Sequence, residues 1–130
     1  MYKLKIDSID HIVLTVKNLE KTLFFYKETL AMELTRYGEK GIGLKFGQQQ
    51  INLHEAGTTI EPKALNPTPG SADLCLITTT PIKKVEEHLL TRGISIELGP
   101  IHRNGALGMM NSIYIRDPDE NLVEIAEYFE

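Results

Sequence analysis

The chain has 130 residues, of which 42% are hydrophobic and 25% charged, a composition typical of one globular domain. Its formal net charge is −4 and no basic stripe occurs, which disfavours a nucleic-acid partner. Cys75 is the sole cysteine, so no intrachain disulfide forms, and a reducing compartment, the cytoplasm, is expected. The first residues lack the apolar run of a signal peptide and no stretch is long enough to span a bilayer, so no membrane partner is expected.

The first predicted element is a β-strand over Asp10–Val16. A strand places alternate side chains on opposite faces, so His11 lies with Val13 and Thr15 and away from the leucine face. Both faces are largely apolar, which indicates a sheet covered on both sides. His11 is therefore either a satisfied core residue or a ligand.

A helix is predicted over Asn18–Leu30, because Asn18 is a good N-cap and apolar residues recur behind it at helical spacing. Glycines and polar residues then separate three short predicted strands, Met32–Tyr37, Ile42–Phe46 and Gln50–Glu55. In the third strand, alternation puts Asn52 and His54 on one face. His54 is either a strand-end residue near solvent or a ligand.

The segment 57–70 contains three prolines and has no periodicity, which predicts a linker. The second half begins with a predicted strand over Ala72–Thr78 and a helix that has Thr80 as its N-cap and Pro81 at its first position. The remaining predicted elements are a short strand Ser95–Leu98, a loop Gly99–Gly108, and strands Met109–Arg116 and Asn121–Tyr128 joined by a turn at Asp117–Glu120.

Both halves thus follow the order strand, helix, strand, strand, strand, which predicts a structural repeat. His11 and Asp73 are 62 residues apart, as are the predicted caps Asn18 and Thr80. The closing strands align at a spacing of 72 residues, and the extra ten residues fit in the loop around Gly99–Gly108.

The repeat matches His11 with Asp73 on the opening strands and Asn52 with Glu124 on the closing strands. Two curved sheets related by a pseudo-twofold axis would direct these positions to one cavity, where histidine and carboxylate suit a divalent ion. The alternatives are structural. Glu124, on a mostly apolar strand, needs a partner, and an arginine such as Arg103 or Arg116 would supply one.

Asp73 and Cys75 also have structural interpretations. An aspartate at the start of a strand often caps a turn, which would account for Asp73. Cys75 shares a face with Asp73, but a lone cysteine on a strand is more often a small buried hydrophobe.

Two motifs resemble the vicinal oxygen chelate superfamily, which includes glyoxalase I, bleomycin-binding proteins and extradiol dioxygenases. They are Asp10–Val16 with Phe25-Tyr26 in the next helix, and Arg116–Asp119 followed by Asn121–Ile125. Further strings, among them 46–54 and 67–75, resemble the branch that contains glyoxalase-domain-containing protein five and bacterial virulence-associated proteins.

The resemblance implies an α+β fold in which two βαβββ modules form a curled mixed sheet around a cavity. It implies a single glyoxalase-like domain over residues 1–130, with module one at about 7–56, a linker at 57–70 and module two at about 71–129. It also implies a homodimer whose modules pair within one chain or across the dimer.

The resemblance further implies a divalent metal ion, zinc, nickel, manganese or iron, bound by the opening and closing strands. His11 matches the first-strand ligand and Glu124 the last-strand ligand. Where the metal enzymes have histidine this chain has Asp73, and where glyoxalases have glutamate or glutamine it has Asn52. His54 is the residue that would replace either one, so the expected metal ligands are His11, Glu124, His54 and Asp73.

The first functional interpretation is a metal-dependent glyoxalase-like lyase or isomerase that acts on a small oxygen-chelating substrate through an enolate or oxyanion. Glu124 would be the catalytic base, and Arg103 with His102 would bind an anionic substrate group from a loop whose glycines let it move as a lid. The alternative is a metal-free protein that sequesters a small molecule such as a drug. Thiol transfer to an antibiotic and ring cleavage by a dioxygenase rank lower.

Overall fold

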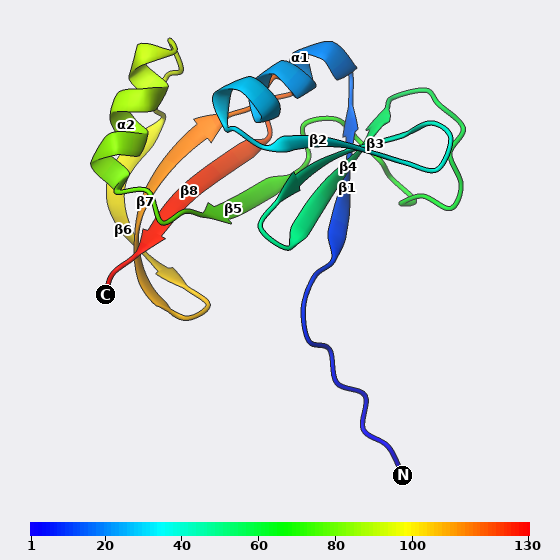
Figure 1. The fold of residues 1–130 in the computed structure, drawn as a ribbon, viewed down its shortest axis with the longest axis horizontal. Coiled ribbons are helices and arrows are strands. Elements are labelled where there is room, and N and C mark those ends of the chain that lie inside the picture. Colours follow the sequence, from blue (N-terminus) through cyan, green and yellow to red (C-terminus); the bar gives the residue numbers. More distant parts are fainter. The chain divides into compact units, whose positions relative to one another are not determined.

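The computed structural model describes all residues from Met1 to Glu130 and divides the chain into two compact units, Met1–Pro67 and Thr68–Glu130. Each unit contains one helical segment and a four-stranded sheet, which confirms the α+β class (Figure 1). The boundary between the units lies inside the segment 57–70. Neither helix has the length and hydropathy that crossing a membrane requires.

The first unit is built around a sheet with strand order β1-β4-β3-β2. Strands β1 and β4 pair in parallel, and the other neighbours are antiparallel. The chain returns from β1 through helix α1 and a π-helical segment, and it then adds the other three strands in a meander. The bounds are β1 His11–Val16, α1 Leu19–Leu23, π-helical segment Phe24–Thr29, β2 Glu33–Tyr37, β3 Gly41–Phe46 and β4 Gln49–Glu55.

The second unit repeats this topology with strand order β5-β8-β7-β6, in which β5 and β8 are parallel. Its elements are β5 Asp73–Ile77, α2 Ile82–Thr91, β6 Leu98–Gly105, β7 Gly108–Arg116 and β8 Leu122–Tyr128. The repeat that the spacing predicts is therefore present: β1 corresponds to β5, and β4 corresponds to β8.

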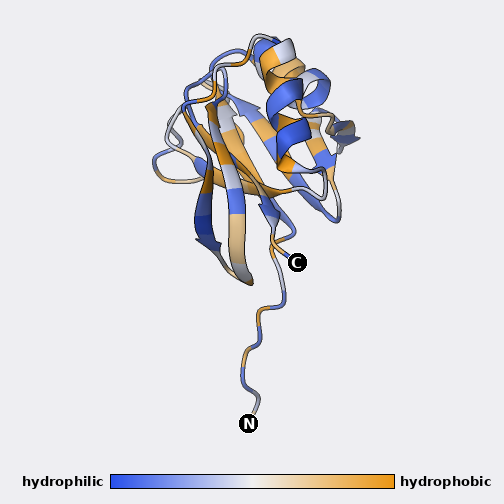
Figure 2. Ribbon diagram, turned by 90° about the vertical axis from the view of Figure 1, so that its left-hand side faces the viewer, coloured by the Kyte–Doolittle hydropathy of each residue, from blue (hydrophilic) through white to orange (hydrophobic).

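Each sheet has one apolar, buried face and an opposite face of mixed composition, called the polar face below, on which Met110 and Ala126 are buried and Val13 is exposed. The expectation that both faces of the first strand are covered is therefore wrong for its exposed residues His11 and Val13. Figure 2 shows hydrophobic and hydrophilic residues interspersed along the strands. In the first unit, Leu14, Val16 and Ile51 are buried on the apolar face. In the second, Ile113, Val123 and Ile125 form its counterpart, and α2 packs against β7. The residues between these positions occupy the opposite faces, where His11 and Glu124 lie.

The prediction of a loop over Gly99–Gly108 is wrong. Most of this segment belongs to strand β6, which pairs with β7. The last pair is Gly105 with Gly108, so a connection of only two residues joins the strands. The prolines and glycines are typical of a loop, but Gly99 and Pro100 instead form an irregularity inside the strand pairing. The segment is therefore a hairpin and not the flexible loop that its glycines predict.

The helix starts differ in how well the sequence predicts them. Asn18 caps α1 as expected, since its side-chain oxygen accepts from the backbone N–H of Lys21 at 3.0 Å. Helix α2 begins at Ile82, with Pro81 rather than Thr80 at the N-cap position. The carboxylate that accepts from the Ile82 N–H, at 3.0 Å, belongs to Glu127 on β8.

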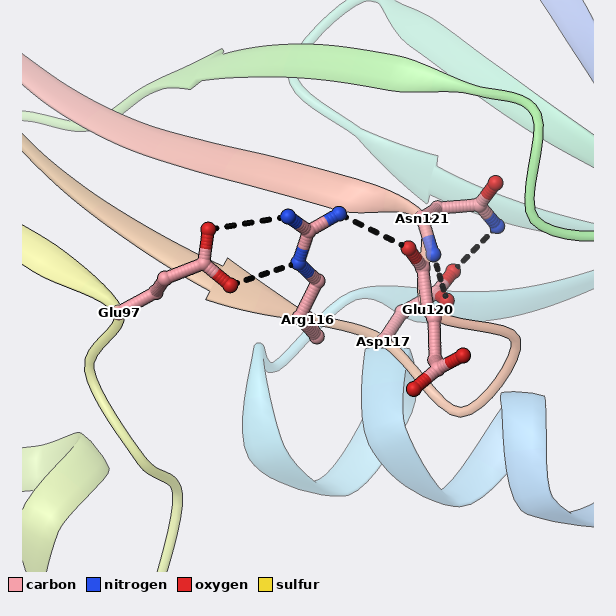
Figure 3. A network of polar contacts seen from close by, with 5 residues as sticks. All are labelled: Glu97, Arg116, Asp117, Glu120 and Asn121. Carbon is pink, nitrogen blue, oxygen red and sulfur yellow. Dashed lines mark hydrogen bonds and ion pairs between the residues drawn. The ribbon is translucent and has the colours of Figure 1, made fainter.

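A buried polar cluster holds the turn between β7 and β8, where the sequence predicts it (Figure 3). Oδ1 of Asp117 accepts from the backbone N–H groups of Asp119 and Asn121, both at 2.9 Å. Oδ2 of Asp117 accepts from the Asn121 side chain at 2.8 Å, and Asn121 in turn accepts from the Ala72 N–H before β5. The turn thereby ties the end of β7 to the start of β5 and β8.

Candidate functional site

The polar face of the first sheet brings together the residues that alternation predicts. His11 pairs with Gln50, Val13 with Asn52, and Thr15 with His54 in the parallel register of β1 and β4. His11 is exposed, Asn52 is buried and His54 is half-buried. His11, Asn52 and His54 therefore share one face, in three successive rows.

His11 is oriented by its neighbour in the sequence. Its Nδ1 lies 2.8 Å from Oδ1 of Asp10. A carboxylate that accepts from one ring nitrogen fixes the tautomer and leaves the other nitrogen with a lone pair, which is the usual arrangement of a metal-binding histidine. Nε2 of His11 is thus the candidate donor atom.

Asn52 is engaged within the sheet. Its Oδ1 accepts from Nε2 of Gln50 at 2.6 Å, above Gly43 on β3. The hydroxyl of Thr35, also beside Gly43, is buried without a hydrogen-bond partner. Asn52 is therefore a member of a local amide network, and its carbonyl oxygen is already used.

The polar face of the second sheet presents a row of three functional groups across adjacent strands. Cys75 on β5 is opposite Glu124 on β8, and Glu124 is opposite Tyr114 on β7. Asp73 lies one row away on β5 and is exposed, whereas Glu124 and Tyr114 are half-buried. Asp73 and Glu124 both lie on strands, as the sequence predicts, and the register of β5 and β8 puts both on this face.

Cys75 contradicts the expectation of a buried hydrophobe, because the structure leaves it exposed. Its thiol hydrogen-bonds to the Glu124 carboxylate. Desolvation, followed by the negative charge and hydrogen bond of Glu124 and by the charge of Asp73, raises the pKa of Cys75 to about 11. The thiol is therefore protonated at neutral pH and acts as a hydrogen-bond donor to Glu124.

Neither candidate arginine neutralises Glu124. Nε of Arg103 donates to the Tyr114 hydroxyl at 3.1 Å. Arg116 forms a two-pronged pair with Glu97, at 2.8 and 2.9 Å, and also donates to the Glu120 carbonyl (Figure 3). This pairing lowers the pKa of Glu97. The salt-bridge interpretation of Glu124 thus finds no support, and its hydrogen-bonding neighbour is Cys75.

Arg103 and His102 lie on strand β6 rather than in a loop. The register pairs Arg103 with Met110 and His102 with Asn111, so the two side chains are on opposite faces of the sheet. Arg103 is on the face of Glu124 and Tyr114, while the His102 ring packs edge-on against Phe129 with 4.9 Å between ring centroids. The structure does not bring them together as one anion clamp.

Tyr114 is the residue that the sequence analysis missed. A tyrosine in an apolar strand usually belongs to the core. Tyr114 instead lies on the same face of β7 as Ser112 and Met110, and it is opposite Glu124. The predicted turn at Asp117–Glu120 places Arg116 opposite Asn121, whereas the structure pairs Arg116 with Leu122, and this one-residue shift brings Tyr114 opposite Glu124.

No group of three or more histidine, cysteine, aspartate or glutamate side chains forms a complete metal site. The donor chemistry of the individual residues nevertheless fits a divalent ion: His11 offers an oriented imidazole nitrogen, and Glu124 offers a carboxylate that no cation neutralises.

Sequence comparison places this fold among known proteins. The model of the Glyoxalase/Bleomycin resistance protein/Dioxygenase superfamily matches residues 8–125. Virulence protein STM3117 of Salmonella typhimurium is 53% identical over 95% of this chain and 85% of its own length. Its crystal structure has a TM-score of 0.95, at 52% identity over 97% of this chain and all of that one.

Two further proteins illustrate the range of this similarity. Glyoxalase domain-containing protein RDO1 of Mycosarcoma maydis is 44% identical over 97% of this chain and 71% of its own length. TnmS3, an antibiotic binding protein from Streptomyces sp. CB03234, shares the fold with a TM-score of 0.75 at 21% identity, over 98% of this chain and all of that one. The fold, its motifs and these matches show that the chain belongs to the glyoxalase/bleomycin resistance protein/dioxygenase superfamily.

Proposed function

We propose that this protein is a divalent-metal-dependent, glyoxalase-like lyase or isomerase that acts on a small oxygen-chelating substrate. The observation that carries the proposal is the state of Glu124, a half-buried carboxylate that no arginine or lysine neutralises and that a protonated thiol contacts. A carboxylate in this state is able to accept a proton from a substrate carbon and return it to a neighbouring one.

The proposed ligands are His11 and Glu124, with Asp73 and His54 as the two candidates that would complete the set. Zinc, nickel, manganese and iron are all compatible with nitrogen and oxygen donors. When bound, such an ion supplies Lewis-acid stabilisation of negative charge on a substrate oxygen. Asp10 holds the imidazole of His11 in one tautomer through Nδ1.

Residues of the second unit would bind the substrate and move the proton. Glu124 holds or releases the proton at its carboxylate, and the Cys75 thiol orients that carboxylate by donating to it. Arg103, fixed by its contact with the Tyr114 hydroxyl, offers its guanidinium to an anionic substrate group on the same face. A separate role for His102 in substrate binding stays a prediction, on the opposite face of β6.

The decisive experiment measures two quantities on the same protein: the metal content per chain and the exchange of substrate protons with solvent. Untagged protein is dialysed and its metal per chain is counted. The methylglyoxal–glutathione adduct is then followed by NMR in D2O, because proton transfer through an enolate introduces deuterium. We expect stoichiometric metal that is lost in both His11→Ala and Glu124→Ala, with His88→Gln as a matched histidine control on α2. Protein that stays metal-free after addition of nickel, zinc or manganese would refute the proposal.

The second candidate is a metal-free binding protein, which the shared fold of the antibiotic-binding TnmS3 favours. Titration with a planar apolar drug distinguishes the two: saturable binding to metal-free protein, with no deuterium incorporation, supports this candidate. Glu124→Gln would then leave binding nearly unchanged, because no charge on that residue is needed to sequester an apolar molecule.

We also propose a cytoplasmic homodimer. The unpaired cysteine supports the cytoplasm, and the pairing of modules in the superfamily supports the dimer. Light scattering on the eluting protein tests the dimer, and a mass near the 14.7 kDa of one chain would contradict it.

A further inference from the structure

A pocket of about 200 Å³ lies inside the first unit, between the end of β4 and the connection that follows it, which is green in Figure 1. Its polar lining consists of Thr15, His54, Glu55, Thr58, Thr59 and Lys63. Ligand pockets for drug-sized molecules measure about 300–1,000 Å³. The smaller volume therefore suits a single compact group.

The pocket has one cationic lining residue, Lys63, and one acidic lining residue, Glu55. The carboxylate of Glu55 is turned toward the start of α1, where its Oε2 accepts from the Leu19 N–H at 3.2 Å. Lys63 is held only by a long contact of 3.9 Å between its Nζ and Oε1 of Glu61, and its side chain is 39% exposed. A surface pair of this length contributes little, so the Lys63 ammonium is available to a ligand.

His54 is the second donor. Its ring is half-buried, lines the pocket and makes no hydrogen bond to the protein. A partly buried imidazole without a partner gains from a ligand that accepts its N–H. Hydroxyls of Thr15 and Thr59 line the same pocket and add further donors for oxygen atoms.

We propose that this pocket binds a small anion, the carboxylate or phosphate group of a metabolite, through Lys63 and His54. The site goes beyond the proposed reaction, because every lining residue belongs to the first unit and His54 is the one candidate metal ligand among them. The proposal assigns His54 to anion binding and leaves Asp73 to complete the metal ligands.

The test is an amide NMR titration of the full chain with sodium acetate and, separately, with inorganic phosphate, at constant pH and ionic strength. Sodium chloride controls for the effect of a small anion of different shape, and acetamide controls for a neutral molecule of the same shape as acetate. We expect saturable shifts centred on Gly57, Thr58 and Thr59. Saturation with acetate alone identifies a carboxylate site, and saturation with phosphate identifies a phosphate site.

Two variants and one matched control complete the test. Lys63→Gln and His54→Gln are each expected to weaken anion binding about tenfold, the usual effect of losing a hydrogen bond to a charged group. Lys21→Gln removes an exposed lysine of α1 and is expected to change nothing. The metal content of Lys63→Gln should equal that of the unmodified protein, so this proposal can fail independently of the proposed function.

The proposal is overturned if neither anion gives saturable shifts, if acetamide gives the same shifts, or if Lys63→Gln binds as tightly as Lys21→Gln. It is also overturned if His54→Gln loses metal in step with His11→Ala, because His54 would then belong to the metal ligands. Lys63 lies on the surface, so its variant keeps the test informative even where His54→Gln fails to fold.

Discussion

The thiol of Cys75 donates a hydrogen bond to the carboxylate of Glu124 across the parallel pair of β5 and β8. A neutral donor next to a half-buried carboxylate satisfies part of its hydrogen-bonding capacity without neutralising its charge. The same contact makes the thiol a poor nucleophile, because the thiolate would lie against two carboxylates, Glu124 and Asp73. The contact thus lowers the reactivity of the thiol.

Cys75 should react slowly with a disulfide reagent in the folded, metal-free protein. The rise of its pKa from 9.0 to about 11 lowers the thiolate fraction near pH 8. Two pH units correspond to about a hundredfold slower reaction than in the urea-unfolded chain. Because Cys75 is the sole cysteine, the absorbance of the released reagent reports it alone. Glu124→Gln removes one charge and should accelerate the reaction, and equal rates in folded and unfolded chains would contradict the expectation.

The same raised pKa predicts how stability depends on pH. The folded state binds the thiol proton more tightly than the unfolded state, so the contribution is fully present below pH 9 and is lost as pH rises toward about 11. Urea unfolding at several alkaline pH values should therefore show a steeper fall for the unmodified protein than for Cys75→Ala. Parallel pH profiles for the two proteins would show that the thiol is not linked to folding.

Alternation alone puts Asn52 and His54 on one face of β4, whereas the shared face with His11 depends on the pairing of β1 with β4. Strand β6 could not be predicted in the same way. Glycine, proline and asparagine dominate its local pattern, and its structure depends on pairing with β7. The cap of α2 is equally non-local, because Glu127 lies 45 residues from Ile82. Tyr114 was missed because its functional neighbour is on another strand.

Asp117→Ala should destabilise the protein by about 3 kcal/mol, because it leaves buried donors of Asn121 without an acceptor. Urea unfolding measures the change. Glu120→Ala alters an exposed side chain in the same turn and should cost less than about 0.5 kcal/mol. If both variants are equally stable, the buried cluster does not hold the turn.

Glu127→Ala should destabilise helix α2 by about 1 kcal/mol, the usual effect of losing an N-terminal acceptor. Glu127→Gln keeps an oxygen in the same place and should lose less. Hydrogen exchange of the Ile82 amide reports the contact directly, and it should be faster in Glu127→Ala than in Glu127→Gln. Unchanged exchange in both variants would mean that the cap forms without this side chain.

Gly43→Ala should disturb the amide network of the first sheet. A Cβ at this position would lie 2.6 Å from Nε2 of Gln50, 2.9 Å from Oγ1 of Thr35 and 3.0 Å from Oδ1 of Asn52. Overpacking of this kind costs about 1–3 kcal/mol. The side-chain NH2 resonances of Gln50 and Asn52 should shift, whereas Lys40→Ala, at an exposed position in the turn before β3, should leave them in place.

Arg103 should affect substrate binding more than turnover, provided that the proposed reaction is correct. The contact between its Nε and the Tyr114 hydroxyl fixes the guanidinium on the face of Glu124, so Arg103→Gln removes both the charge and its orientation. We expect KM in the deuterium-exchange assay to rise about tenfold with a smaller change in kcat, as for a lost charged hydrogen bond. Arg103→Lys keeps the charge but not the planar donor set, and it should recover only part of the loss.

Tyr114→Phe keeps the arginine but removes the hydroxyl that orients it, so its KM should fall between those of the unmodified protein and Arg103→Gln. An unchanged KM in Arg103→Gln, in protein whose thermal unfolding is normal, would remove Arg103 from the substrate site and leave Glu124 to be judged by the exchange assay alone.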